Sequence, residues 1–588
     1  MKNIWRREMF IKKQLEEELK KVFKTLNFDE ELAAVSASSQ ADYQCNAPFA
    51  LAKRIGKSPA SIAVEICAEM NKSSTLAKFE PSGAGFVNIT LKNDAILSFA
   101  NEIFSTGKLP LVRSQLGQTV FFDYGGANIA KELHIGHLRS AIIGEAIKRV
   151  YRELGADTIS DVYLGDWGLQ FGLIITQAED EGILEILGDE VRYYKEITLE
   201  LLNEIYPRAS KRKNDDKEFY ARAEKATVLL QSKTPTYFSV WKKIREISLV
   251  AIKRNYENLN CEFDIWGGES AAQDFIPRVL AELCLKGLTR TSDGAVIMDV
   301  AGEGEHILGE DGKYKNPMPP IILKKHNGGA LYATNDVATI FARYKEFKPD
   351  KFVYVVDARQ DLHFNQVFRC VKKAGFVSAG TQLVHIPYGT INGKDGKPFK
   401  TRSGDTIKLE DIINLVADEA EKRLEKAGDR ETAQKIGLSA LKFADLSNNV
   451  RKDYIFDIEK CISFEGKTGP YLLYTVARIN SILAKNAIEQ SKGFGEILKL
   501  DDEIRAIIVA VLRICEAIQN AAETLTLNNI CDAVYVLAQN FSAFYATHNI
   551  QNEKDAALKN DWLSVCALTK TAITEALNVL AIDTVERM

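Results

Sequence analysis

TVFFDYGGANIAKELHIGHLRS, residues 119–140, is the stretch that decides the fold. Its first six residues form an apolar and aromatic run that predicts a buried strand, and Gly125–Asn128 predicts a loop. A long amphipathic helix follows the histidine pair, with Leu138, Ile142, Ile143, Ala146, Ile147 and Val150 on one side. A strand, a glycine-bearing loop and a helix in this order open a nucleotide-binding α/β unit.

Further strands of the same sheet are predicted on the C-terminal side of this stretch, at DTISDVYLG (157–165), DKFVYVVDA (350–358) and QLVHIPYG (382–389). A charged helical stretch from about residue 182 to 259 interrupts them, and we interpret it as an insertion between two halves of one sheet. The prediction is an α/β domain spanning residues 111–455.

The flanking regions have a different character. Residues 1–110 predict a small α+β domain, helical at first and then strand-like at GAGFVNITL (83–91). Residues 456–588 contain no convincing strand and predict a helical bundle. A chain of 588 residues exceeds what one hydrophobic core usually organises, which agrees with several domains.

Composition limits the function only loosely. The formal net charge of −4 and the pI near 6.1 do not point to a nucleic-acid partner, but binding depends on where basic residues cluster. None of the nine cysteines forms a CxxC or a close Cys/His pair, so we expect no structural metal site and reduced thiols in a cytoplasm. No apolar run is long enough to cross a bilayer, and the N-terminus lacks a signal-peptide core.

The histidine pair carries the first chemical signal. His134 and His137 lie three residues apart at the predicted N-terminal end of a helix, where backbone N–H groups and the helix dipole favour phosphate. Gly136 leaves room for a flat adenine ring near the backbone. Taken alone, this HxGH pattern leaves open an ordinary pair of histidines at a helix start.

The surrounding residues resemble the class I aminoacyl-tRNA synthetases, whose HIGH signature is spelled letter for letter at 134–137, and among them the arginine-specific family. The resemblance continues in family order through GDWGLQFG (165–172), LYATNDVA (331–338), YVVDARQDLHF (354–364), GKDGKPFKTRSGDTIKL (393–409), DYIFD (453–457), SFEGKTGPYLLYTVAR (463–478) and the terminal ERM (586–588). It implies a Rossmann-type parallel-sheet catalytic domain with an insertion, an α+β N-terminal domain that meets the tRNA corner, and an all-α anticodon-binding bundle.

The resemblance also implies a two-step reaction with ATP, L-arginine and tRNA(Arg) as substrates and Mg²⁺ assisting. The arginine carboxylate attacks the ATP α-phosphate to give arginyl-adenylate, and the tRNA then accepts the arginyl group. His134, Gly136 and His137 are expected to bind ATP. The segment 393–409 corresponds to the second signature loop of class I synthetases. In this loop, Lys400 and Arg402 are expected to hold the triphosphate.

That loop departs from the usual KMSKS, because Thr401 takes the place of the second lysine. The transition state still needs compact positive charge at the α-phosphate. Arginine enzymes with this departure carry a lysine just upstream of HIGH, and Lys131 occupies that place. The alternative is that Lys131 is a solvated side chain before a helix.

A guanidinium presents five coplanar donors and requires acceptors around it. The resemblance assigns guanidinium recognition to Glu269, Tyr332 and Asp336, and the amino-acid backbone to Asn128 and Gln360. Taken singly, each could equally be an ordinary surface or structural polar residue. Asn335, and Gly125–Ala127 before the signature, differ from the residues usual in the family. None of them is among the proposed arginine contacts.

Two groups of residues resemble tRNA contacts of the family. The N-terminal group is Asp42, Tyr43, Gln44 and Asn46, where an aromatic beside amides could stack on exposed bases. The C-terminal group is Tyr471, Tyr474, Arg478 and Met588. The alternatives are a polar turn for the first group and a tyrosine packing stripe for the second.

Three other functions remain open. Another class I synthetase, such as the cysteine enzyme, would need zinc-type cysteine spacing, which is absent. A nucleotidylyltransferase shares the HxGH logic but needs neither the guanidinium acids nor the helical tail. A catalytically silent tRNA-binding protein would be marked by loss of His134, His137 or Lys131, and all three are present. On family grounds we expect a monomer that acts in the cytoplasm, away from membranes.

Overall fold

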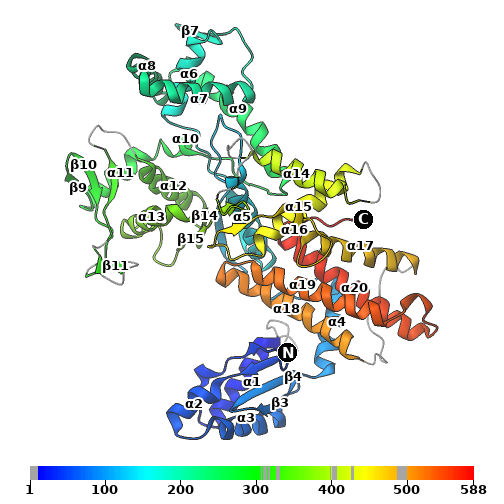
Figure 1. Ribbon diagram of the computed structural model, residues 1–588. Coiled ribbons are helices and arrows are strands. Elements are labelled where there is room, and N and C mark those ends of the chain that lie inside the picture. Colours follow the sequence, from blue (N-terminus) through cyan, green and yellow to red (C-terminus); the bar gives the residue numbers. More distant parts are fainter. Residues whose placement is uncertain are drawn as a thin grey trace. The chain divides into compact units, whose positions relative to one another are not determined.

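The computed structural model describes residues 11–302, 304–305, 307–308, 314–315, 318–325, 331–397, 399, 407–424, 429–486 and 500–588. It divides into two compact units (Figure 1). One unit comprises Gln115–Ile462 and Leu580–Ile582 and contains the predicted catalytic domain. The other comprises Met1–Ser114, Ser463–Val579 and Asp583–Met588.

The centre of the catalytic unit is a parallel sheet in the order β15-β14-β5-β6. Its strands are β5 (Thr119–Asp123), β6 (Asp157–Asp161), β14 (Lys351–Asp357) and β15 (Gln382–Tyr388). All four strands were predicted from their apolar runs. The inner strand β14 is buried from Phe352 to Val355, as expected for a parallel strand covered on both faces. Helix α5 (Ile135–Glu153) connects β5 to β6, so the predicted strand–loop–helix opening is confirmed.

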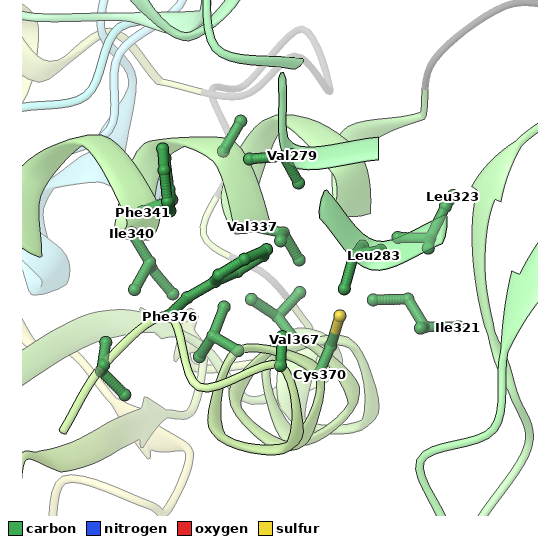
Figure 2. Close-up of a cluster of buried hydrophobic side chains, with 14 of the residues drawn as sticks. Val279, Leu283, Ile321, Leu323, Val337, Ile340, Phe341, Val367, Cys370 and Phe376 are labelled. Atoms are coloured by element: carbon green, nitrogen blue, oxygen red, sulfur yellow. The ribbon is translucent and has the colours of Figure 1, made fainter. Parts of the chain in front are cut away.

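Helices beside the sheet bury a large apolar cluster (Figure 2). They are α10 (Glu269–Ala272), α11 (Ile276–Leu285), α12 (Tyr332–Phe347) and α13 (Asp361–Lys373). Val279, Val337, Val367 and Phe376 meet in this cluster. The packing fixes the N-terminal ends of α12 and α13 relative to α10, and these ends carry most of the proposed arginine contacts.

The predicted insertion is present and largely helical (Figure 1, cyan to green). It follows α6 (Leu169–Asp180) and consists of the hairpin β7 (Leu184–Leu187) and β8 (Glu190–Tyr193), then α7 (Leu199–Asp215), α8 (Lys217–Gln231) and α9 (Pro235–Asn258).

A second insertion, between α11 and α12, was not predicted. It contains a small antiparallel sheet of β9 (Arg290–Ser292), β10 (Ala295–Met298) and β13 (Ile321–Lys324), and the pair β11 (Ile307–Leu308) and β12 (Tyr314–Lys315). Strands of two to four residues are too short to establish an alternating apolar pattern in the sequence.

The catalytic unit ends with the short parallel pair β16 (Ile391–Asn392) and β17 (Tyr454–Ile455) and the helices α14 (Leu409–Glu421), α15 (Arg430–Leu446) and α16 (Ile458–Cys461). Arg139 of α5 is buried among them. It pairs with Asp445 of α15 at 3.0 Å and donates to the carbonyl oxygens of Gly389 and Lys452. These bonds hold the signature helix in place from its buried side.

The other unit joins the α+β N-terminal part and the helical C-terminal part. The N-terminal part is an antiparallel sheet in the order β1-β2-β4-β3 with helices on it. Its elements are α1 (Ile11–Thr25), η2 (Glu30–Leu32), β1 (Ser36–Ala37), β2 (Tyr43–Cys45), α2 (Ala47–Ile55), α3 (Pro59–Ser73), β3 (Ala77–Ser82), β4 (Phe86–Leu91) and α4 (Asn93–Thr106). The C-terminal part comprises α17 (Gly469–Lys485), α18 (Asp502–Thr524), α19 (Asn528–Thr547), η4 (Ile550–Asn552) and α20 (Ala556–Val579). The predicted fold classes are confirmed for both parts.

Candidate active site

The histidine pair forms the N-terminal cap of α5. The Gly136 N–H donates to His134 Nδ1 at 3.0 Å, and the His134 N–H donates to His137 Nδ1 at 3.1 Å. Gly136 leaves room for the His134 ring, because a Cβ atom at this position would lie 2.7 Å from His134 Cε1 and the ring would have to move. The glycine therefore lets the His134 ring fold over the helix end. This is a second reason for a glycine at position 136, besides the predicted room for an adenine ring.

Both imidazoles have lowered pKa values. Desolvation, with a contribution from Lys131, lowers the pKa of His134. Desolvation and the neighbouring His134 lower the pKa of His137 to about 3. Both rings are therefore neutral at physiological pH. His134 Nδ1 accepts a backbone N–H, which assigns the ring proton of His134 to Nε2. His137 Nδ1 lies near both the N–H and the carbonyl oxygen of His134, at 3.1 and 3.2 Å, so either ring nitrogen of His137 can carry the proton. A neutral imidazole that donates Nε2–H beside a helix N-terminus can bind a phosphate oxygen without carrying charge itself.

The C-terminal end of the second signature loop is attached to this turn. The Ile135 N–H donates to the Ile407 carbonyl at 3.0 Å, and the Leu409 N–H donates to the Leu133 carbonyl at 2.8 Å. Lys408 pairs with Glu132 at 2.6 Å. The structure therefore brings the end of the second signature loop beside HIGH.

On the other side of this loop, the Phe399 N–H donates to the Ile391 carbonyl at 3.0 Å, and its ring lies 6.0 Å from that of Phe456. Lys400 and Arg402 lie outside the described residues. Their assignment to the triphosphate stays a prediction.

Lys131 lies close to the histidine pair, since its charge contributes to the lowered pKa of both imidazoles. Its ammonium group is 4.4 Å from the ring centroid of Tyr206, which belongs to α7 of the insertion. The preceding Ala130 has a φ of 62° and donates its N–H to Ser248 Oγ of α9 at 3.0 Å. The insertion thus fixes the backbone and the side chain at the position expected to supply positive charge.

Glu269 is placed by a buried carboxylate that the sequence analysis did not single out. Asp166, in the GDWG segment, is fully buried and accepts hydrogen bonds from the Ser270 N–H at 2.9 Å, the Ser270 hydroxyl at 2.8 Å and Arg245 Nε at 2.8 Å. A Cβ atom at Gly268 would lie 2.6 Å from Asp166 Oδ1, so only glycine fits there. These bonds hold the start of α10, and with it Glu269, against the sheet edge.

Two proposed guanidinium acids are electrostatically coupled. Desolvation, Asp336 and Asp166 raise the pKa of Glu269 to about 7. Asp336 lies on the first turns of α12, half-buried, with its Oδ2 2.5 Å from His363 Nε2. Tyr332 is the first residue of the same helix and is 74% exposed. Two half-buried carboxylates repel each other when both are ionised, and a bound cation relieves that repulsion.

Asn335 links the two helices that carry these acids. Gln273 Nε2 donates to Asn335 Oδ1 and to the Glu269 carbonyl, both at 3.1 Å. The unusual residue in the LYATNDVA block is therefore a structural contact between α10 and α12.

The residues expected to hold the amino-acid backbone lie on neighbouring segments at the carboxyl ends of β5 and β14. Asn128 is exposed and sits over Gly165, where a Cβ atom would lie 2.3 Å from Asn128 Oδ1. Gln360 is exposed and caps the N-terminal end of α13 directly after β14. Both side chains lie at the sheet edge where ligands of open α/β sheets bind.

Arg343 and Tyr163 lie beside these residues and were not singled out from the sequence. Buried Arg343 pairs with Asp123 and Asp161 at 2.6 Å each, at the carboxyl ends of β5 and β6. Tyr163 has a φ of 43°, and its hydroxyl accepts from Thr339 at 3.1 Å. Burial and the nearby Asp336 and Glu269 hold its pKa well above the usual range. The sequence shows only that Tyr163 precedes GDWG and that Arg343 lies on a helix.

The N-terminal residues expected to contact tRNA behave in two ways. Tyr43 is fully buried, donates its hydroxyl proton to Glu516 of α18 and has the Arg513 guanidinium 4.2 Å from its ring centroid. Asp42 is buried and pairs with Arg505. The expectation that Tyr43 stacks on a base is therefore wrong, because its ring has no free face.

The other two N-terminal residues remain accessible. Gln44 is half-buried and donates to Asn88 Oδ1 at 2.8 Å, and Asn46 is exposed at the start of α2. Their assignment to tRNA binding stays a prediction.

In the C-terminal part, Tyr471, Tyr474 and Arg478 lie on α17 as predicted. The Tyr471 hydroxyl is 3.0 Å from Ser542 Oγ, so this residue packs against α19. Tyr474 is 45% exposed, and the Arg478 guanidinium lies 3.9 Å from the ring centroid of Tyr545. Met588 is half-buried. The exposed tyrosine and the arginine stacked on a tyrosine are the members of this group that fit contacts to bases.

Among the residues that the structure describes, no helix has the length and apolarity needed to span a membrane. The same residues contain no group of three or more His, Cys, Asp or Glu side chains placed to hold a metal ion.

The parallel sheet and its signature turn define a class I aminoacyl-tRNA synthetase, and the family profile described as "tRNA synthetases class I (R), catalytic domain" matches residues 100–458. "Arginyl tRNA synthetase N terminal domain" matches residues 9–91, and "DALR anticodon binding domain" matches residues 472–588. An arginine–tRNA ligase of Alkaliphilus oremlandii is 37% identical over 598 residues, covering 98% of this chain and 99% of the relative.

A second arginine–tRNA ligase, from Agathobacter rectalis, is 38% identical and covers 98% of this chain and 99% of its own length. The chain belongs to the arginyl-tRNA synthetase family. The crystal structure of arginyl-tRNA synthetase from Plasmodium falciparum has the same fold, with a TM-score of 0.81, 23% identity and coverage of 99% of this chain and 100% of that one.

Proposed function

We propose that this protein is an arginine–tRNA ligase that converts ATP, L-arginine and tRNA(Arg) into arginyl-tRNA(Arg), AMP and diphosphate through arginyl-adenylate. The observation that carries the proposal is the pairing of two features in one unit. A neutral imidazole pair caps a helix beside the second signature loop, and the coupled acids Glu269 and Asp336 flank the carboxyl end of the same sheet.

The first step forms a bond between an arginine carboxylate oxygen and the α-phosphorus of ATP, and the bond to the pyrophosphate oxygen breaks. The protein supplies no nucleophile, so its contribution is positioning and charge stabilisation. His134 and His137 donate Nε2–H groups to phosphate oxygens, and the N-terminal end of α5 adds its backbone N–H groups. Lys131 supplies the full positive charge at the α-phosphate that the Thr401-containing loop lacks. In the second step, the 2′-hydroxyl of the terminal adenosine attacks the acyl carbon and AMP leaves.

Arginine is selected by its charge and its five donors. Glu269 and Asp336 accept hydrogen bonds from the guanidinium, with Tyr332 beside them, while Asn128 and Gln360 hold the α-amino and carboxylate groups. Shorter or apolar amino acids leave the half-buried acids Glu269 and Asp336 unpaired, which weakens their binding. For this reason the site rejects them without a separate editing domain.

The remaining parts of the proposal concern partners. Gln44, Asn46, Tyr474 and Arg478 bind tRNA(Arg) through exposed polar and aromatic groups. Mg²⁺ enters with the ATP phosphates, because the imidazoles of the signature turn are poor ligands for an ion that prefers oxygen. The protein acts as a monomer in the cytoplasm, where ATP and tRNA are available.

The test is ATP–pyrophosphate exchange against all twenty amino acids, with and without tRNA(Arg). Of the twenty amino acids, only arginine should support exchange, and exchange with arginine should be near background until tRNA is added. The sequence supports this requirement, because Gly396 and Gly404, with Gly393 just before the loop from Lys394 to Lys408, raise the entropic cost of fixing that loop in one conformation, and contacts with tRNA offset this cost. Deleting residues 456–588 should remove the stimulation by tRNA. Exchange with another amino acid at the arginine rate would contradict the function, whereas vigorous exchange without tRNA would contradict only the tRNA requirement.

A further inference from the structure

His363 contacts one of the proposed arginine-binding residues, and the proposed reaction does not use its side chain. It lies on the first turn of α13, three residues after Gln360, and its Nε2 is 2.5 Å from Asp336 Oδ2. The imidazole edge rests on the Phe364 ring, with centroids 5.2 Å apart and an interplanar angle of 88°. Both partners are largely shielded, with side-chain exposures of 23% for His363 and 17% for Asp336. This hydrogen bond is therefore largely shielded from solvent.

Nearby arginine side chains pair with other carboxylates. Arg343 is taken up by the carboxylates of Asp123 and Asp161, and Arg245 by that of Asp166. Glu269, on α10, is an acid and repels Asp336. Within the described part of the chain, His363 is the side chain that hydrogen-bonds the Asp336 carboxylate.

This bond has a direct consequence for recognition. A carboxylate has two oxygens, and donation from His363 fixes Oδ2, so Oδ1 is left to accept from a guanidinium. Without the bond, the Asp336 side chain can rotate, and arginine binding must then supply the lost rotamer entropy. Binding sites gain affinity when a hydrogen-bonded neighbour holds the recognising group in one orientation.

We propose that His363 is a positioning residue for arginine recognition, which sets the Asp336 carboxylate in the orientation that accepts the guanidinium. The inference rests on the proposed function, because it presumes that Asp336 binds arginine. It also explains the order of residues on α13: one short segment after β14 supplies Gln360 for the amino-acid backbone and His363 for the side-chain acid.

The test compares His363→Ala and His363→Gln in arginine-dependent pyrophosphate exchange with tRNA present. The Ala variant should raise the KM for arginine about 10- to 50-fold, with kcat within about threefold and the KM for ATP unchanged. Gln carries an N–H donor of similar reach and should restore the KM to within about threefold. Leu362→Ala, an exposed residue on the same turn, is the matched control and should behave as wild type.

A double-mutant cycle with Asp336→Asn separates the inference from the proposed function. If His363 acts through Asp336, the Ala substitution should change the KM for arginine by no more than about twofold in the Asp336→Asn background. A normal KM in Asp336→Asn itself would overturn the proposed pocket. A crippled Asp336→Asn together with a normal His363→Ala would overturn the inference alone. If His363→Ala lowered kcat and raised the KM values for arginine and ATP to a similar extent, and His363→Gln did not restore them, the role of His363 would be structural and the inference would be overturned.

Discussion

Protonation of Glu269 should control arginine affinity near neutral pH. Desolvation and the negative charges of Asp336 and Asp166 raise the pKa of this carboxyl from 4.5 to about 7. Below that pH, Glu269 in the arginine-free protein is largely neutral. A guanidinium binds the ionised form, so affinity must rise with pH and fall as the pH drops through 7.

The magnitude follows from the ionised fraction. With a pKa of about 7, roughly one eleventh of the free protein is competent at pH 6 and roughly ten elevenths at pH 8. The apparent dissociation constant for arginine should therefore increase about tenfold from pH 8 to pH 6. Arginine binding at pH 6 should also release close to one proton, since the bound guanidinium requires the carboxylate.

The assay is isothermal titration calorimetry with arginine at pH 6, 7 and 8, in two buffers of different ionisation enthalpy at each pH. Glu269→Gln should bind arginine weakly and with little dependence on pH. Glu257→Gln, an exposed glutamate on α9 of the same unit, is the control and should retain the wild-type profile. A flat profile in the wild type, or a tenfold change that persists in Glu269→Gln, would refute the assignment of this titration to Glu269.

Four further outcomes are expected. Lys131→Ala should lower kcat about a hundredfold and leave arginine binding in calorimetry nearly unchanged, because its charge acts in the transition state. Gly136→Ala should displace the His134 ring from the cap and lower kcat/KM at least tenfold, with an unaltered circular dichroism spectrum. Arg343→Met should cost about 3–5 kcal/mol in denaturant unfolding, because it leaves two buried carboxylates without their partner. Arginine-free Glu269→Gln should be more stable than wild type at pH 8 and equally stable near pH 4, since a raised carboxyl pKa removes stability as pH rises through 7.

The signature turn of the candidate active site could be predicted because its residues lie in one short contiguous segment. The HIGH turn needs a histidine, a glycine and a histidine in fixed spacing, and the structure shows the local reason in the cap that His134 and His137 form. The four parallel strands were predictable for a related reason. A strand covered on both faces is an unbroken apolar run, which is visible without knowing its neighbours.

The sequence was a poorer guide where a side chain's role depends on a distant partner. Tyr43 was interpreted as an exposed aromatic, yet Arg513 and Glu516 lie hundreds of residues away and bury it. The DYQCN segment itself does not show whether its tyrosine is exposed for stacking on a base or buried against residues from another part of the chain.

The sequence by itself determined the sheet, the helical tail and the signature turn, and it predicted which acids would suit a guanidinium. Only the tertiary structure decided how these acids are held and charged. Asp166 fixes the segment that carries Glu269, and His363 reaches Asp336 from another helix. The physical reason is that the pKa and orientation of a carboxylate depend on burial and on groups a few ångströms away, and those distances exist only once the chain has folded.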